Sequence, residues 1–528
     1  MLREIPAPEQ ALAGWREKIK TQWAWAFWGT VLPGLLVHFY RMSHYFMVDD
    51  SPYFSYHQQN ISYLGRWMLQ WAGAISSYME LPALNVWLGL VYLGVFAVLF
   101  VELLQVKTPL LCGVIGCCLA VLPAVTTTML FAYAADPYML ALVLAAGAVL
   151  AARRLPGWKG VAGGAVLLCL SMAIYQAYLD VAVLLCLLVC FGATLQGGCR
   201  RALATAGQLA LAGAAGVLLY MGSTKLVLGI QGVTAIEYGG FSSMGQLDPA
   251  GSLRVLRTLY LGADHVFMNK LVYATSLPWQ LLGWGILGLM ALLAAALLWQ
   301  SGRRQGLSGP GPLAAHWALG CLWLVLLPAG ATTLAILQPE TFPYNSLNGF
   351  ANGLFLLIPL VFADWMRPSP LGVVQLTRWA TLGALLLMSW HFTLLANQSA
   401  RVLEIIAQRD VANSNRILAR MEMQEGYSIH ARVFFGGKGV EVVSETPLME
   451  YADLLTLMIR GVHTDSLLFG DNAYHHFLND NFGTNFAYLS EAEQQAILDS
   501  AEYAAMPPWP AEGCVRTIGD VLVVRLSE

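Results

Sequence analysis

The stretch Leu84–Leu104, LNVWLGLVYLGVFAVLFVELL, contains a single charged residue, Glu102. As a helix rising 1.5 Å per residue, it is long enough to cross the roughly 30 Å hydrocarbon core of a bilayer. The link Gln105-Val106-Lys107-Thr108 separates it from a second apolar run at 109–128. Because this link is so short, the two runs are expected to form neighbouring antiparallel helices. The sequence therefore predicts a helical membrane protein.

The composition of the whole chain agrees with that prediction. Of its 528 residues, 57% are hydrophobic and only 12% are charged, whereas about 25% charge is usual for a soluble domain. A purely soluble enzyme is excluded, because so few charges cannot cover an aqueous surface of this size. The net charge of −3 gives no reason to expect a nucleic-acid partner.

Apolar runs of spanning length recur along the first three quarters of the chain, and they are separated by short polar links. The eleven predicted spans lie near 22–40, 84–104, 109–128, 137–152, 161–175, 178–196, 202–222, 278–299, 313–337, 349–366 and 372–396. Alternate loops at 126–136, 173–178 and 338–348 contain no Lys or Arg. The positive-inside rule therefore places the N-terminus in the cytoplasm and, with an odd number of spans, the C-terminus outside.

The predicted fold is an all-α polytopic plasma-membrane protein of about 11 transmembrane helices, with a small extracytoplasmic α+β domain at its C-terminus. Residues 1–397 form the transmembrane domain, with outer loops at 41–82 and 223–277. Residues 398–528 form the C-terminal domain, which holds 18 of the 32 acidic and 9 of the 29 basic residues. We expect this domain to have an accessory role.

Local patterns predict elements within that C-terminal domain. Ser399–Met423 reads as a charged amphipathic helix, and the stretches Ala431–Phe435 and Val521–Arg525 are typical of strands. Of nine cysteines, only Cys514 lies outside by this topology. The sequence therefore predicts no exported disulfide framework.

An acidic pair, Asp49 and Asp50, follows the outer end of the first span. Ser51 and Pro52 are suited to the N-cap and first position of a helix, so the carboxylates could serve only to complement a helix N-terminus. The following segment, Phe54–Trp71, predicts an amphipathic helix on the outer leaflet. A carboxylate pair beside such a helix suits an amphiphilic substrate, and we interpret Asp49 and Asp50 as catalytic candidates.

Two other outer turns carry polar side chains. Asp136, followed by Pro137 and Tyr138, is either the N-cap of the fourth span or a second acidic site that contacts the acceptor. Tyr175 and Gln176, in the turn between the fifth and sixth spans, either line the substrate site or belong to an interfacial aromatic belt. Both alternatives remain open at this stage.

Cations in the outer loops are candidates for phosphate binding. Asp248-Pro249 predicts a helix start, which would place Arg254 and Arg257 three positions apart on one face. Arginines near lipid headgroups also snorkel without binding a ligand, so this alternative remains. Lys225 lies in the same loop.

The chain lacks the sequence patterns of common cofactor and metal sites. We find no zinc-type cluster, nucleophile elbow, Walker loop or dinucleotide fingerprint. The sequence therefore predicts no cofactor and no metal ligand set. It leaves open a divalent cation held near Asp49, Asp50 and Asp136.

These motifs together resemble the Gtr-type integral-membrane glucosyltransferases, which have the GT-C fold. The resemblance rests on five short motifs: Val48-Asp49-Asp50, Leu64-Gly65-Arg66-Trp67, Asp136-Pro137-Tyr138, Tyr175-Gln176-Ala177-Tyr178 and Ile518-Gly519-Asp520. The family usually has a small residue or proline where this chain has Trp67. The motifs are spread over nearly the whole chain, and their combination carries the resemblance.

The resemblance implies a polyprenyl-phosphate-glucose donor and transfer, with inversion, to a cell-surface polysaccharide or a teichoic-acid-like acceptor on the outer face. It implies that Asp49 or Asp50 is the base, and that Arg66 lies near the donor phosphate with Lys225, Arg254 and Arg257. Two alternatives remain, a flippase or transporter of lipid-linked sugars and a polysaccharide polymerase. All three share lipid substrates and the bilayer as partners.

Overall fold

The computed structural model describes most of the chain. The described residues are 7–44, 60–236, 248–261, 271–274, 276–307, 309–342, 346–366, 372–437, 439–440, 466–468 and 472–527. The chain divides into two compact units. The helical unit comprises residues 1–42 and 58–396, and the C-terminal unit comprises residues 43–57 and 397–528.

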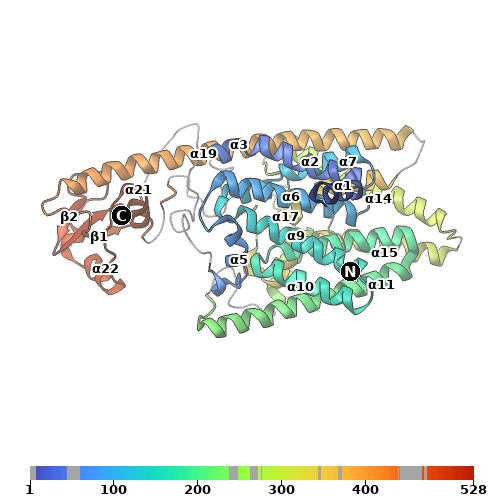
Figure 1. Ribbon diagram of the computed structural model, residues 1–528, viewed down its shortest axis with the longest axis horizontal. Helices are drawn as coiled ribbons and strands as arrows, with labels where there is room; N and C mark the ends of the chain where they lie inside the picture. Colours follow the sequence, from blue (N-terminus) through green and yellow to red (C-terminus); the bar gives the residue numbers. More distant parts are fainter. Residues whose placement is uncertain are drawn as a thin grey trace. The chain divides into compact units, whose positions relative to one another are not determined.

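The helical unit consists of helices and short links (Figure 1). Its elements are α1 (Pro8–Lys18), α2 (Thr21–Val37), α3 (Phe39–Ser43), η1 (Ser62–Leu64), α5 (Leu69–Gly73), η2 (Ala74–Ser76), α6 (Pro82–Leu103), α7 (Pro109–Ala120), α8 (Pro123–Leu130), α9 (Ala132–Arg154), α10 (Trp158–Ile174), α11 (Tyr178–Gln231), α12 (Pro249–Leu261), α14 (Leu277–Arg304), α15 (Pro310–Gly330), α16 (Thr333–Leu337), η4 (Pro339–Thr341), α17 (Phe350–Leu354), η5 (Phe355–Leu357), α18 (Ile358–Trp365) and the first half of α19 (Gly372–Glu422).

Helices occupy all eleven ranges that the sequence predicts as spans, but the count of eleven spans is not confirmed. Among the described residues, six helices are long and apolar enough to cross a membrane: α6, α9, α11, α14, α15 and α19. The pair α7 and α8, bent by 50°, would make a seventh if it forms one span. Helices α2 and α10 are shorter, with 17 residues each. The structure thus supports a membrane protein without fixing which end faces the cytoplasm.

Two long helices each cover two predicted segments; one is kinked between its segments and the other is continuous. Helix α11 covers the predicted spans 178–196 and 202–222, and it kinks between them at Gly198, where φ is 73° and ψ is −177°. Only glycine adopts such a conformation readily, so it marks the boundary between the two spans. Helix α19, by contrast, runs without interruption through residues 396–399, where two separate helices are predicted. No Gly or Pro lies at this junction to end it.

The predicted amphipathic helix from Phe54 to Trp71 is wrong in the part that the structure describes. Residues 54–59 lie outside the described chain. From residue 60 on, the short η1 ends at Gly65, whose φ of 75° breaks the helical path, and α5 begins only at Leu69. The left-handed glycine is a strong helix terminator that the apolar periodicity does not reveal.

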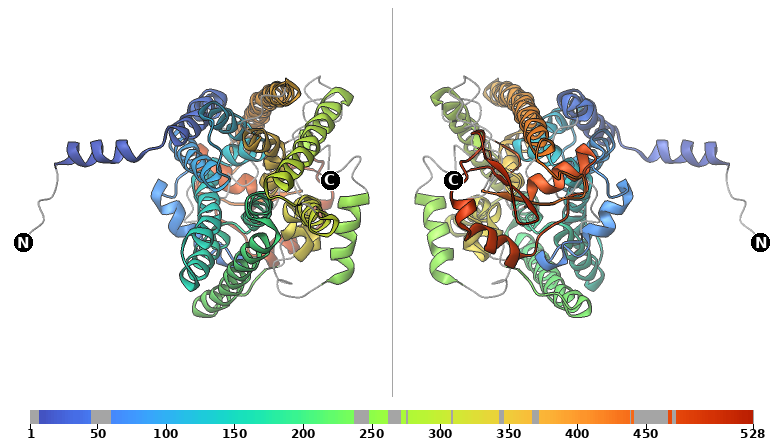
Figure 2. Two further views of the ribbon diagram at one scale, coloured as in Figure 1. Left: turned by 90° about the vertical axis from the view of Figure 1, so that its right-hand side faces the viewer. Right: turned by 90° about the vertical axis from the view of Figure 1, so that its left-hand side faces the viewer.

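The bundle is held together by close helix contacts, several of them through glycines. Helix α2 packs on α6 and α7, α9 packs on α6 and α10, and α11 packs on α10 and α15. A Cβ added at Gly116 of α7 would lie 2.6 Å from the carbonyl oxygen of Ala26 on α2, and one at Gly29 would lie 2.5 Å from that of Gly113. Figure 2 views the bundle close to end-on and shows α1 projecting away from it.

The C-terminal unit contains a three-stranded sheet and short helices. Its strands are β1 (Arg432–Gly436), β2 (Val515–Ile518) and β3 (Val521–Arg525), and its helices are α21 (Ala473–Phe482), α22 (Glu491–Leu498) and α23 (Ala501–Ala504). The sheet order is β1-β3-β2, with β1 parallel and β2 antiparallel to β3. The predicted strands at 431–435 and 521–525 are confirmed, whereas β2 was not predicted because it is short and only half buried.

Candidate functional site

Arg66 is the centre of a cluster at one end of the bundle, in the link between η1 and α5. Its guanidinium carbon lies 5.0 Å from the centroid of the Tyr175 ring. Its Nη1 donates a hydrogen bond to the Tyr138 hydroxyl at 3.0 Å, and its Nε lies 3.4 Å from Oε1 of Gln176. The structure therefore brings together four residues that the sequence singled out in three separate motifs.

Aromatic stacking fixes the platform on which Arg66 lies. The Tyr138 and Tyr175 rings are stacked, with centroids 4.1 Å apart and planes 13° apart, and both residues are buried. The Tyr175 hydroxyl donates to the side-chain oxygen of Asn348. A cation held over an electron-rich ring is stabilised by the ring quadrupole. The Tyr175 ring therefore attracts the guanidinium, and the stack with Tyr138 fixes where that ring lies.

The local backbone explains why Tyr175 and Gln176 project into this cluster. Helix α10 ends at Ile174, the next residue Tyr175 is extended (φ −154°, ψ 112°), and α11 begins at Tyr178. The Gln176 side-chain amide donates to the carbonyl of Leu64 at 2.7 Å and to the Tyr220 hydroxyl at 2.9 Å. The Tyr220 hydroxyl in turn donates to the Gly65 carbonyl at 3.3 Å. These bonds fix the backbone immediately before Arg66.

Sequence reasoning missed Tyr220 and Asn348. Tyr220 is fully buried and lies near the end of the predicted span 202–222, where a tyrosine is also typical of an interfacial belt. Asn348 lies in the loop 338–348, whose sequence stands out only by its lack of Lys and Arg. Nothing in either local sequence indicates a contact more than 150 residues away.

Asp136 lies on a different side of α9 from Tyr138. Its carboxylate is fully buried, and Oδ1 accepts a hydrogen bond from the Asn85 side chain of α6 at 2.9 Å. The Asn85 oxygen accepts from the backbone N–H of Leu81 at 2.7 Å. Because α9 begins at Ala132, Asp136 is inside the helix, and the N-cap alternative is wrong. The structure shows Asp136 joining α9 to the start of α6.

The other predicted phosphate-binding cations lie on α11 and α12. The predicted helix start at Asp248 is confirmed, because its Oδ1 accepts the Gly251 N–H at 3.0 Å. Arg254 and Arg257 lie one turn apart on α12, and Lys225 lies near the end of α11; all three are exposed. Within the described chain their side chains make no hydrogen bond or ion pair. Among the described residues, none of the three therefore contacts the residues that surround Arg66 through a hydrogen bond or an ion pair.

The predicted catalytic pair, Asp49 and Asp50, lies outside the described residues, so its role stays a prediction. Among the residues that the structure describes, no three His, Cys, Asp or Glu side chains are grouped as metal ligands. The divalent cation left open near Asp49, Asp50 and Asp136 therefore also stays a prediction.

A buried ion pair anchors the chain a few residues before the acidic pair. Arg41 Nη2 lies 2.6 Å from Glu80 Oε1, and the two side chains are only 2% and 1% exposed. The guanidinium also donates to the Leu130 carbonyl at 3.1 Å. Burying two charges is costly unless they are paired and hydrogen-bonded, as they are here. The pair therefore fixes the end of α3, next to the segment that carries Asp49 and Asp50.

Comparison with known proteins gives one match. A family model described as glucosyl transferase GtrII matches residues 40–340, more than half of the chain. The matched range includes every site residue that the sequence predicted. No curated protein and no solved structure matches the chain.

Proposed function

This chain belongs to the glucosyl transferase GtrII family, and we propose that it transfers glucose from a polyprenyl-phosphate donor to a cell-surface polysaccharide or a teichoic-acid-like acceptor. Family membership indicates a glucosyltransferase, and the long apolar helices indicate a membrane protein. The donor, the acceptor and the outer-face location are our proposals. They follow from the resemblance to Gtr-type glucosyltransferases; the Arg66 cluster supports the choice of donor, and the positive-inside rule supports the outer face.

The observation that carries the donor assignment is the half-buried guanidinium of Arg66 on its tyrosine platform. A guanidinium presents planar N–H donors that match phosphate oxygens. It lies at one end of a membrane bundle, where the phosphate of a lipid-linked sugar would lie at headgroup level. The surrounding Tyr138, Tyr175 and Gln176 side chains are mostly buried, so little water competes for the charge.

The reaction that fits this arrangement is a single displacement. The oxygen of an acceptor hydroxyl forms a bond to the anomeric carbon, while the bond from that carbon to the phosphate oxygen breaks. The hydroxyl proton passes to a carboxylate, and the lipid phosphate leaves with one more negative charge. Attack from the face opposite the leaving group inverts the anomeric centre. Arg66 stabilises the charge that develops on the leaving phosphate.

We assign the base to Asp49 or Asp50, because an acceptor hydroxyl needs a carboxylate to take its proton. Arg41 and Glu80 hold the chain shortly before this pair. Asp136 supports the site by joining α9, which carries Tyr138, to α6. We keep Arg254, Arg257 and Lys225 as contacts to the phosphate or acceptor outside the Arg66 cluster.

The test uses the purified full-length protein with a polyprenyl phosphate that carries radiolabelled glucose. Asp49→Asn or Asp50→Asn should lower the rate of glucose transfer about a hundredfold, since that is the usual contribution of a general base. Glu340→Gln, which removes an exposed acid elsewhere, should leave the rate at the parent level. If both Asp variants and their double variant transfer glucose as fast as the parent, neither residue is the base.

The same assay separates the remaining alternatives. A flippase would move the lipid-linked sugar across vesicles without forming a new glycosidic bond, whereas a transferase gives a glucosylated acceptor and free polyprenyl phosphate. A polymerase would lengthen the acceptor chain. We expect single glucose side branches and unchanged chain length, measured by mass spectrometry of the acceptor.

A further inference from the structure

A polar cavity lies in the helical unit, away from the Arg66 cluster. Its volume is about 490 Å³, and its walls come from the α6–α7 link, α11, α14 and α18. Along α11, the lining residue Gln196 lies about 27 Å from Tyr178 at 1.5 Å per residue. The cavity is therefore at the opposite end of the helices from Arg66, the end that the positive-inside rule places in the cytoplasm.

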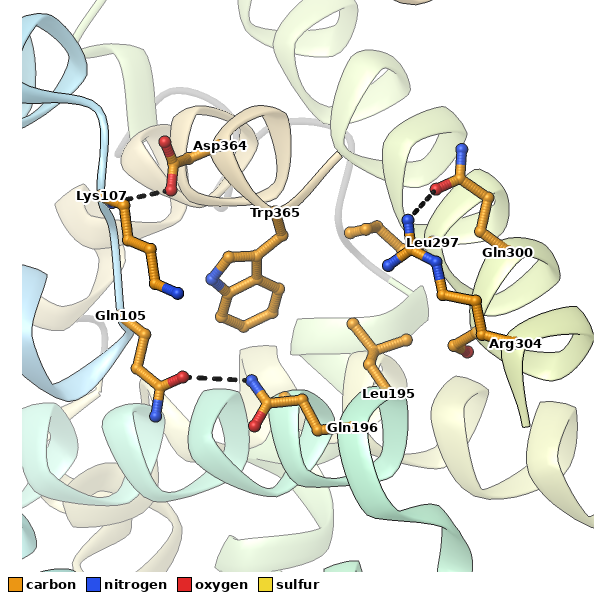
Figure 3. Close-up of a pocket in the computed structure, with 11 residues that line it drawn as sticks. Gln105, Lys107, Leu195, Gln196, Leu297, Gln300, Arg304, Asp364 and Trp365 are labelled. Carbon is orange, nitrogen blue, oxygen red and sulfur yellow. Dashed lines mark hydrogen bonds between the residues drawn. The ribbon is translucent and has the colours of Figure 1, made fainter. Parts of the chain in front are cut away.

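Two cations reach toward this cavity from different elements. Figure 3 shows Lys107, from the α6–α7 link, and Arg304, from the end of α14, pointing toward the space beside Trp365. The Arg304 guanidinium contacts the Gln300 side-chain oxygen only at 3.5 Å. Within the described chain the Lys107 ammonium makes no hydrogen bond or ion pair. Both positive groups are thus placed to receive an anion.

The one carboxylate that lines the cavity, Asp364, is hydrogen-bonded to backbone N–H groups. Asp364 accepts hydrogen bonds from the N–H groups of Lys107 at 2.8 Å and Thr108 at 3.0 Å, and from the Thr108 hydroxyl. These bonds hold the start of α7, where unsatisfied N–H groups favour a carboxylate. The lining therefore keeps a net positive charge after Asp364 is counted.

The remaining lining suits an amphiphile. Gln105 and Gln196 are joined by a side-chain hydrogen bond of 3.2 Å and offer neutral polar groups. Trp365 is fixed by a 2.7 Å bond from its Nε1 to the Leu104 carbonyl and presents its ring. Leu195 of α11 and Leu297 of α14 add aliphatic side chains to the wall.

We propose that this cavity binds the phosphate-bearing headgroup of an anionic amphiphile, with Lys107 and Arg304 on the phosphate. Charge-assisted hydrogen bonds from both cations supply the attraction. Gln105, Gln196 and Gln300 contact the polar groups attached to the phosphate, and the acyl chains of a lipid extend from the cavity into the surrounding bilayer. A membrane phospholipid and a soluble phosphate ester share this headgroup chemistry. The proposal is independent of the glucose donor and its site.

The experiment measures binding to the purified full-length protein in a neutral detergent by native mass spectrometry. The probes are phosphatidylglycerol, phosphatidylcholine as the neutral lipid, and glycerol phosphate as the soluble ester. The parent should bind phosphatidylglycerol about tenfold more tightly than phosphatidylcholine. The double variant Lys107→Gln with Arg304→Gln should lose this preference. Neither donor nor acceptor is present, so the result does not depend on the proposed transferase activity.

A matched control tests whether the preference for anionic lipid comes from the cations of this cavity or from positive charge anywhere on the protein. Arg200→Gln with Arg303→Gln removes two exposed cations that do not line the cavity, and it should keep the parent's preference. Binding of glycerol phosphate with the same dependence on Lys107 and Arg304 would support the headgroup chemistry and identify a soluble ligand. The proposal is overturned if the parent prefers neither anionic probe, or if the control loses the preference equally. If the double variant does not fold, Lys107→Gln alone carries the same comparison.

Discussion

Arg66 makes contacts that a planar guanidinium can form and an ammonium cannot. It lies over the Tyr175 ring while donating to the Tyr138 hydroxyl, which requires a flat group with several N–H donors. Tyr175 is in turn stacked on Tyr138 and donates its own hydroxyl to Asn348. The position of the cation therefore depends on the ring of Tyr175 more than on its hydroxyl.

This dependence gives a test at the residue level. Tyr175→Leu removes the ring, and we expect the KM for the lipid-linked donor to rise about tenfold, since a cation–π contact and its stacking contribute roughly 1–2 kcal/mol. Tyr175→Phe keeps the ring and should change the KM by less than about threefold. Steady-state kinetics on purified protein provide the measurement. Equal effects of the two substitutions would show that the hydroxyl, and not the ring, matters.

At the level of elements, α2 and α7 pack closely because small residues meet at their interface. A Cβ at Gly116 would lie 2.6 Å from the Ala26 carbonyl oxygen and 2.7 Å from the Thr30 hydroxyl. Within a bilayer, helices associate largely through such close packing, because lipid removes most of the hydrophobic drive between them. The interface therefore has no space for a larger side chain.

Gly116→Val should separate these helices and destabilise the helical unit by about 1–3 kcal/mol, as overpacking usually does. Gly207→Val on α11 is the matched control, because an added Cβ there meets nothing within 4 Å. Thermal unfolding in detergent should show a lower midpoint for the first variant only. An unchanged midpoint for Gly116→Val would mean that α2 and α7 are not packed in this way.

The sequence predicts the helices better than the site. Apolar length is a local property, so all eleven predicted ranges contain helix, and even the break at Gly198 lies between two of them. Whether a short helix such as α2 crosses the membrane depends on its neighbours, which is why the count is not settled. The motifs singled out Arg66, Tyr138, Tyr175 and Gln176. They could not show that these residues meet, because the contacts join residues 72 and 110 positions apart.

Across the whole molecule, the two units are built from different chemistry. The helical unit is apolar and places few charges in its interior, whereas the C-terminal unit holds most of the acidic residues. In the C-terminal unit, His475 is 2% exposed, its Nε2 donates to the Phe486 carbonyl at 2.8 Å, and its ring is stacked on Tyr488. Burial lowers the pKa of His475 below its usual 6.5, against the smaller opposing effect of the Phe486 carbonyl.

A lowered pKa makes the stability of this unit sensitive to acid. Between the folded and unfolded pKa values the unfolded chain binds more protons, so stability is full above about pH 6.5 and falls as the pH drops below it. In the full-length protein, we expect protease cleavage within the C-terminal unit to begin at a lower urea concentration at pH 5 than at pH 7. His475→Gln should reduce this difference. If His475→Gln shows the same shift in urea concentration between pH 5 and pH 7 as the parent, groups other than His475 cause the acid sensitivity.

The most direct measurement is the initial rate of glucose transfer from a purified polyprenyl-phosphate-glucose donor by the full-length protein. Arg66→Gln removes the cation proposed to stabilise the leaving phosphate, and we predict a fall of at least about a hundredfold in kcat/KM. Arg200→Gln, an exposed arginine on α11 outside the Arg66 cluster, should transfer glucose at the parent rate. Full transfer by Arg66→Gln, or no transfer from this donor by the parent, would contradict the proposed donor site.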